Sequence, residues 1–358
     1  MQIWFTGVAS PRSTARTARE LEAAGWDGLL VVDSQNLSGD PYVALAGAAL
    51  VTTKLGLGTG VTNSVTRHAA VTATSIASVQ RLANGRAVLG IGRGDSALAH
   101  LGRAPARLGP FERYLGQLQT YLRGDSVPFE EIDIPIDVAP PMSELELADA
   151  PPASRIGWIA ETSGVKVPVE VAASGPRVIA IAARHADRIM FALGADEERI
   201  AWGIAQAKAA RAKAGLDPAG LRFGAYINCA CHEDIDTARA LVKGGLTTFA
   251  RFSVMHGKAS GPVSDGDRAV LHELRDSYDM KAHTRGDSRQ AGTLTNAFVD
   301  RFAIVGGPDR VVERLRGLAK LGLDKVAISG GMRGAPEEHI PVGKELMVKE
   351  VIPGMKAP

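Results

Sequence analysis

The sequence of 358 residues has little of several features that mark common protein classes. It contains two cysteines, aromatic residues make up 5% of it, and 41 basic against 39 acidic residues leave a formal net charge of +2. So small a charge argues against nucleic acid or an anionic membrane surface as a partner. No stretch approaches 18 uninterrupted apolar residues, and the first residues, MQIWFTGVASPR, lack the pattern of a signal peptide. We therefore expect a cytoplasmic protein.

The two cysteines, Cys229 and Cys231, are two residues apart. On a strand they share one side of a single chain, which is a poor geometry for a disulfide. The sequence has no C-x-x-C pair, and its eight histidines show no H-E-x-x-H spacing. We interpret the cysteines as reduced packing residues and expect no metal site.

Short apolar runs alternate with amphipathic helical stretches, which is the pattern of a parallel sheet covered by helices. Gly25 is expected to end the first helix, and Asp40 with Pro41 to begin the second. A chain of this length allows two or three domains or one enlarged barrel, and a count of eight runs favours an α/β fold, a (β/α)8 TIM barrel, over a doubly wound sheet. The eight runs are residues 2–7, 28–32, 54–59, 87–91, 167–172, 188–191, 222–229 and 325–329.

Two segments, after strands 4 and 7, are longer than a barrel loop requires. Residues 124–155 hold eight acidic side chains, several prolines and, before Arg155, no Lys or Arg. We interpret them as an insertion that is either a solvated excursion or a hairpin or lid beside the active site. Residues 251–301 include helical spacing at 268–281, which predicts extra helices over the barrel mouth. The chain is then a single domain, 1–358, with two insertions.

The active site of such a barrel lies at the C-terminal ends of the strands, where polar residues cluster. Gly90, Gly92 and Gly94 alternate, and bare backbone there lets a flat ligand approach. A dinucleotide fingerprint is excluded because Asp95 stands where its third glycine belongs. Asp95 is a candidate catalytic carboxyl group or, alternatively, an ion-pair partner of Arg93 or a helix cap.

A second cluster, Ser174-Gly175-Pro176, lies where the fifth strand turns into a helix. Free N–H groups and the positive end of the dipole at a helix N-terminus suit a phosphate group. Ser174 adds a hydroxyl donor. The alternative is a simple helix cap with no ligand.

Four segments resemble the luciferase-like monooxygenase superfamily: LGTGVTN at 57–63, LGIGRGDSAL at 89–98, VAASGP at 171–176, and VGGPD at 305–309 with the helix that follows. The nearest branch is that of the methylenetetrahydromethanopterin reductases, which use the deazaflavin coenzyme F420. The resemblance implies a barrel that holds a flavin or deazaflavin at the C-terminal ends of its strands. It also implies a non-prolyl cis peptide, here Gly60-Val61.

The resemblance further implies roles for particular residues. Phosphate contacts fall on Ser174 and Gly175, and the position used for proton transfer in sugar-phosphate relatives falls on Asp95, the expected catalytic residue. The expected cofactor-binding residues are Asp33, Thr59, Gly60, Val61, Asn63, Arg93, Gly94, Ala173, Ser174 and Gly175. One departure is that relatives have Asp-His after strand two, whereas this chain has Asp33-Ser34.

These observations give three hypotheses for function. The first is an F420-dependent oxidoreductase that moves hydride between the deazaflavin C5 and a small organic substrate. A second is a two-component monooxygenase that uses reduced FMN, and a third is a non-catalytic flavin-binding barrel. A homodimer is expected, and a separate flavin or F420 reductase is the expected source of reduced cofactor.

Overall fold

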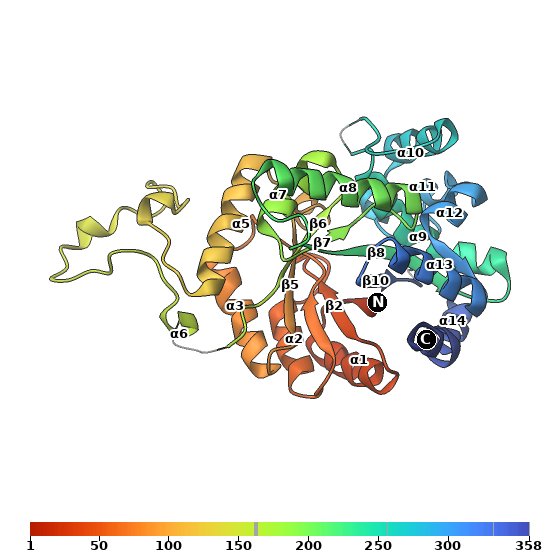
Figure 1. The fold of residues 1–358 in the computed structure, drawn as a ribbon, viewed down its shortest axis with the longest axis horizontal. Helices are drawn as coiled ribbons and strands as arrows, with labels where there is room; N and C mark the ends of the chain where they lie inside the picture. Colours follow the sequence, from red (N-terminus) through yellow and green to blue (C-terminus); the bar gives the residue numbers. More distant parts are fainter. Residues whose placement is uncertain (161–163, 256, 332, 358) are drawn as a thin grey trace.

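The computed structural model describes residues 1–160, 164–255, 257–331 and 333–357. Eight parallel strands form a closed barrel in the order β1-β2-β3-β5-β6-β7-β8-β10, and β10 pairs with β1 to complete the ring (Figure 1). The strands are β1 Gln2–Val8, β2 Gly28–Val32, β3 Gly56–Thr59, β5 Ala87–Gly92, β6 Val169–Ala173, β7 Arg188–Phe191, β8 Arg222–Cys231 and β10 Lys325–Ser329. The predicted (β/α)8 barrel is confirmed, and each of the eight predicted runs overlaps one of these strands.

Two short strands were not predicted. β4 (Thr62–Asn63) follows the cis peptide Gly60–Val61, which the resemblance implies, and pairs with β5. β9 (Ile304–Gly306) pairs with the last residues of β8. Strands of two and three residues are too short to show the alternation on which sequence prediction relies.

Helices surround the barrel, and local sequence determines several of their ends. The Asp40 carboxylate accepts the Tyr42 and Val43 N–H groups at 2.8 and 3.1 Å, and Gly25 has φ +82° just beyond α1, as predicted. The helices are α1 Pro11–Ala23, α2 Pro41–Ala49, α3 Ala69–Leu82, α4 Ser96–Ala99, α5 Leu108–Arg123, α6 Gly157–Ala160, α7 Pro176–His185, α8 Glu197–Lys213, α9 Ile235–Phe252, α10 Asp265–Ser277, α11 Arg289–Gly292, α12 Asn296–Phe302, α13 Pro308–Lys320, α14 Ile340–Leu346 and α15 Ile352–Lys356. None of the helices described is long and apolar enough to cross a membrane.

The floor of the barrel is filled by the Trp4 indole. A Cβ at Gly28 or Gly56 would lie within 2.4 Å of its ring atoms, so both positions require glycine. The fully buried Lys325 ammonium lies 3.3 Å from the centre of that ring and donates to Glu170 at 2.8 Å. Arg188 contacts the other oxygen of Glu170, so one buried carboxylate lies between two cations.

The first long excursion begins after α5, and we call residues 128–153 the arm. Val127 and Ser154 pair as an antiparallel bridge at its base. That base lies beside Asp187 and Arg222, which precede or begin β7 and β8, and is therefore at the N-terminal end of the strands. Figure 1 shows the arm reaching away from the barrel. The alternative of a lid beside the active site is therefore wrong: this connection follows a helix rather than a strand.

The second excursion lies over the other end of the barrel. It contains α10, α11 and α12, which pack with α9 around a second apolar cluster that includes Leu246, Leu274 and Phe298. α10 (Asp265–Ser277) overlaps the stretch whose spacing predicts a helix. Cys229 and Cys231 are free and buried, as expected.

Candidate functional site

Three turns meet at the C-terminal end of the strands. They are the turn from β3 to β4, the loop after β5 and the turn from β6 into α7. A Cβ built on Gly92 would lie 3.2 Å from Val61 and 3.7 Å from Ala172, which shows how closely the three approach. The site residues predicted on these three turns are therefore brought together at the mouth of the barrel.

The glycines in β5 and just after it are required for different reasons. A Cβ at Gly90 would lie 2.1 Å from the Thr59 carbonyl oxygen, so glycine there serves strand packing and not ligand approach. The Thr59 hydroxyl is also committed, because it donates to the Gly90 carbonyl at 2.7 Å. Gly94 has φ +83° and lies against Leu98. The prediction that all three alternating glycines leave room for a ligand is therefore wrong for Gly90.

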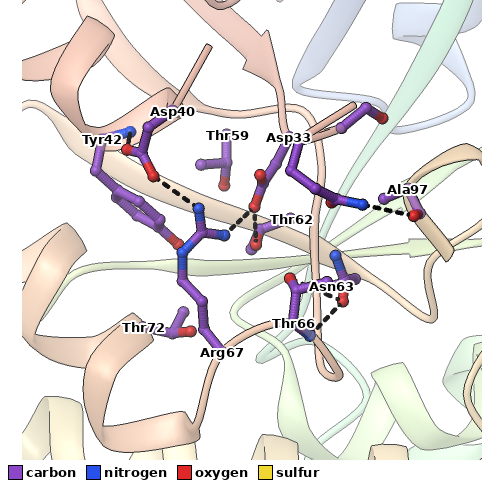
Figure 2. A network of polar contacts seen from close by, with 12 residues as sticks. Asp33, Asp40, Tyr42, Thr59, Thr62, Asn63, Thr66, Arg67, Thr72 and Ala97 are labelled. Carbon is purple, nitrogen blue, oxygen red and sulfur yellow. Dashed lines mark hydrogen bonds and ion pairs between the residues drawn. The ribbon is translucent and has the colours of Figure 1, made fainter. Parts of the chain in front are cut away.

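Asp33 belongs to a polar network behind the mouth (Figure 2). Its carboxylate accepts from Thr62 at 2.6 Å and forms an ion pair with Arg67, which also contacts Asp40. Burial alone would lower the pKa of the Arg67 guanidinium, but the Asp33 carboxylate raises it above its usual value. Since Asp33 is buried and its Oδ2 is occupied, the carboxylate fixes the turn that carries Thr62 and Asn63.

Buried amide groups near the mouth lack hydrogen-bond partners. Asn63 accepts from Val65 and Thr66 through Oδ1, whereas its Nδ2 has no partner in the structure. Asn228, on β8, likewise has an unpaired Nδ2, and the two side chains belong to residues only 1% and 2% exposed. A buried unpaired donor costs about 1–3 kcal/mol, so each is a candidate contact for a ligand acceptor.

The turn from β6 into α7 carries the predicted phosphate site. Ala173 is buried, Gly175 is the N-cap of α7, and Ser174 Oγ makes only a long contact of 3.4 Å with the Phe252 carbonyl. Burial, together with the nearby charge of Arg177, lowers the pKa of the Arg93 guanidinium. An anion would stabilise two cations that repel each other when one of them, Arg177, lies in the first turn of a helix.

Asp95 pairs with a residue that the sequence analysis did not single out. Its Oδ2 contacts Arg251 at the end of α9 and not Arg93; Asp95 is the N-cap residue of α4, but its carboxylate makes no capping hydrogen bond. The Arg251 guanidinium lies 4.6 Å from the centre of the Tyr278 ring, and the Tyr278 hydroxyl lies 2.7 Å from Nδ1 of His283. Burial lowers the pKa of His283 and raises that of Tyr278.

Arg251, Tyr278, His283 and Asn228 are thus site residues that sequence reasoning missed. The first three lie in the second excursion, where no strand end marks them. Phe249, two residues before Arg251 in α9, stacks on Tyr226 from the barrel interior, with 6.1 Å between the ring centres. This contact places the end of α9 directly over the mouth, and only the folded chain reveals it.

A charged hollow lies elsewhere, on the N-terminal side of the barrel. It has a volume of about 1150 Å³ and is lined mostly by charged side chains of α5, α7 and the base of the arm. Within the parts of the chain that the structure describes, no three His, Cys, Asp or Glu side chains gather as metal ligands.

Residues 4–325 match the model of the luciferase-like monooxygenase family, and the chain belongs to this family. The 5,10-methylenetetrahydromethanopterin reductase of Methanolobus tindarius is 27% identical over 338 residues, covering 93% of this chain and 95% of that one. The predicted class, an oxidoreductase of the luciferase-like type, is thereby confirmed.

Two solved structures show the same fold. The coenzyme F420-dependent tetrahydromethanopterin reductase from Methanopyrus kandleri has a TM-score of 0.71 at 20% identity, covering 99% of both chains. The oxygenating constituent of 3,6-diketocamphane monooxygenase of Pseudomonas putida, in complex with FMN, has a TM-score of 0.63 at 17% identity, covering 100% and 99%. Both cofactors considered for this chain thus occur among proteins of this fold.

Proposed function

We propose that this protein is an oxidoreductase that binds coenzyme F420 and moves hydride between C5 of the deazaflavin and a carbon of a small organic substrate. The observation that carries the proposal is the N-terminus of α7, with Arg177 in its first turn and Arg93, from the loop after β5, near enough for the two charges to interact. That arrangement suits a phosphate-bearing cofactor. Similarity over most of the chain to a methylenetetrahydromethanopterin reductase favours F420 over FMN.

The residues at the mouth fit such a cofactor. Ser174 and the Gly175 turn would hold the phosphate with Arg93, and the backbone at Ala173 would lie beside it. The unpaired Nδ2 atoms of Asn63 and Asn228 would donate to oxygen or nitrogen acceptors at the ring edge. The turn at Gly60, Val61 and Gly94 would face the ring with little side-chain bulk.

When bound, the deazaflavin supplies the hydride acceptor or donor at C5. The chain positions the ring and holds a proton near the reacting carbon. Arg251 occupies Oδ2 of Asp95, whereas the described residues offer no hydrogen bond to Oδ1. We assign to Oδ1 the exchange of a proton with the substrate, and to Arg251 the orientation of the carboxyl group.

A titration of the purified protein with F420 and with FMN, followed by reduction and exposure to oxygen, tests this function. We expect tight binding of F420 and slow reoxidation, because a deazaflavin carries hydride and reacts poorly with oxygen. Preference for reduced FMN with oxygen consumption would instead identify a two-component monooxygenase. Binding of neither cofactor would refute every cofactor-dependent function.

A further inference from the structure

The arm exposes apolar side chains that no described part of its own chain covers. Its short helical turns, Phe129–Glu131 and Met142–Leu145, bury no residue. Six large apolar side chains are between 40% and 73% exposed: Phe129, Ile134, Ile136, Val138, Leu145 and Leu147. A concentration of this kind in one protruding segment marks an interaction surface.

The sequence of the arm has a two-residue period. Ile132, Ile134, Ile136 and Val138 alternate with Asp133, Pro135 and Asp137. The chain turns at 135–139, where the Val138 and Ala139 N–H groups donate to the Pro135 carbonyl, so these residues do not form one two-sided strand. The carboxylates among them call for a partner surface that carries positive charge.

Charge identifies that partner as another molecule of the same chain. The arm carries seven acidic residues and no basic one, namely Glu130, Glu131, Asp133, Asp137, Glu144, Glu146 and Asp149. Subtracting these from the 39 acidic residues leaves 32 against 41 basic ones, so the rest of the chain has a net charge of +9. The small net charge of the whole chain is therefore the sum of a negative arm and a positive remainder. Opposite charges of this kind are complementary and can dock on each other.

The charged hollow beside the base of the arm is the matching surface. Six cationic side chains line it, and Glu130, Glu131 and Asp133 from the root of its own arm line it as well. Two of the cations, Lys166 and Arg184, pair with its other carboxylates, Asp187 and Glu112, and the remaining four are Arg113, Arg123, Arg211 and Arg222. The root of the arm already uses it, because Gln117 donates to the Glu131 carbonyl and Asp133 lies 3.5 Å from Arg113. The rest of the arm reaches away from its own barrel (Figure 1).

We propose that the arm docks on the hollow of a second copy of this chain, and that the two copies exchange arms across a two-fold axis. Such an exchange is self-complementary, since each chain gives an acidic arm and receives one on a basic surface. It gives the expected homodimer a specific interface. The proposal is independent of the cofactor.

Photo-crosslinking in a mixture of ¹⁴N- and ¹⁵N-labelled protein tests the exchange. A benzoylphenylalanine at position 136 should join chains of different label, at residues of the hollow. The same probe at the exposed Val342, on α14 beside the C-terminal end of β8 and thus at the end of the barrel opposite the hollow, is the matched control and should give no such product. Crosslinks confined to single chains, or to surfaces other than the hollow, overturn the proposal.

Charge reversal separates a specific interface from chance contact. Arg113→Glu with Arg222→Glu should reduce the inter-chain product at least tenfold, and adding Asp137→Arg with Glu144→Arg should restore it. Replacing residues 128–153 by Asn-Gly keeps the Val127–Ser154 pairing and should weaken dimerisation in sedimentation experiments. A dimer as tight as wild type after this replacement, or reversal without effect on the crosslink, contradicts the proposal.

Discussion

Replacing Arg93 by methionine gives a sharp test of the phosphate site. Arg93 is partly buried, and its Nε donates to the Ala106 carbonyl at 2.6 Å, which leaves its terminal nitrogens for a ligand. Methionine keeps most of the apolar stem and removes the charge. A hydrogen bond between charged groups contributes about 1.5–3 kcal/mol, which corresponds to a loss of roughly 10- to 150-fold in affinity.

The assay is a fluorescence titration with F420 and, in parallel, with a deazaflavin riboside that lacks the phosphate. Arg93→Met should weaken F420 binding by that factor and change binding of the riboside less than twofold. Arg177→Met is the matched variant, and because Arg177 is exposed we expect a loss of only about 0–1 kcal/mol, reduced further by salt. Equal losses for F420 and the riboside would refute the assignment, since Arg93 would then support the ring or the fold.

Four further substitutions test other parts of the structure. Asp95→Asn should lower turnover by about 10²-fold or more and leave F420 affinity within twofold, whereas a large loss of affinity would make Asp95 structural. Glu170→Gln should lower the free energy of unfolding by about 3–5 kcal/mol in urea, against at most about 1 kcal/mol for Glu112→Gln on the surface. Burial lowers the pKa of Lys325 to about 8 from 10.5, so between these values the unfolded chain binds more protons and the free energy of unfolding of the wild type should rise with pH; in Glu170→Gln, which lacks the carboxylate that raises this pKa, the rise should begin at a lower pH. Because the pKa of folded His283 lies below 6.5, the free energy of unfolding falls as pH falls through 6.5. His283→Gln should therefore lose less stability than the wild type on acidification to pH 5, measured by thermal unfolding. Tyr278→Phe should leave F420 affinity unchanged and alter reduction rates on a panel of ketones.

The acid sensitivity assigned to His283 depends on its whole surroundings. Asp95 from the loop after β5 raises its pKa, whereas Arg251 from α9 and His100 beyond α4 lower it together with burial. Tyr278 contributes the hydroxyl at Nδ1. Asp95→Asn should therefore increase the loss of stability at acid pH, although it should leave F420 affinity within twofold. If neither Asp95→Asn nor His283→Gln changes the loss of stability at acid pH, this account is contradicted.

Sequence alone predicted the strands because each is an apolar run bounded by turn residues. It also predicted which turns form the mouth, since all strands of a parallel barrel end on the same side. It did not predict the Asp95–Arg251 pair, whose members are 156 residues apart and share no local pattern. Gly90 was assigned to ligand approach because a missing side chain does not reveal whether a ligand or a neighbouring carbonyl requires the space.

The mouth is built from two parts with different physical origins. The cofactor side consists of strand ends that the closed barrel fixes, and Asn63, Arg93 and Ser174 lie there. The opposite side, with Arg251, Tyr278 and His283, rests on a separate apolar cluster around α9, α10 and α12. Because the second part has its own core, we expect that its residues can change without disturbing the strand ends proposed to hold the cofactor. On this proposal, resemblance at the strand ends bears on the cofactor, and the substrate depends on the excursion over the mouth.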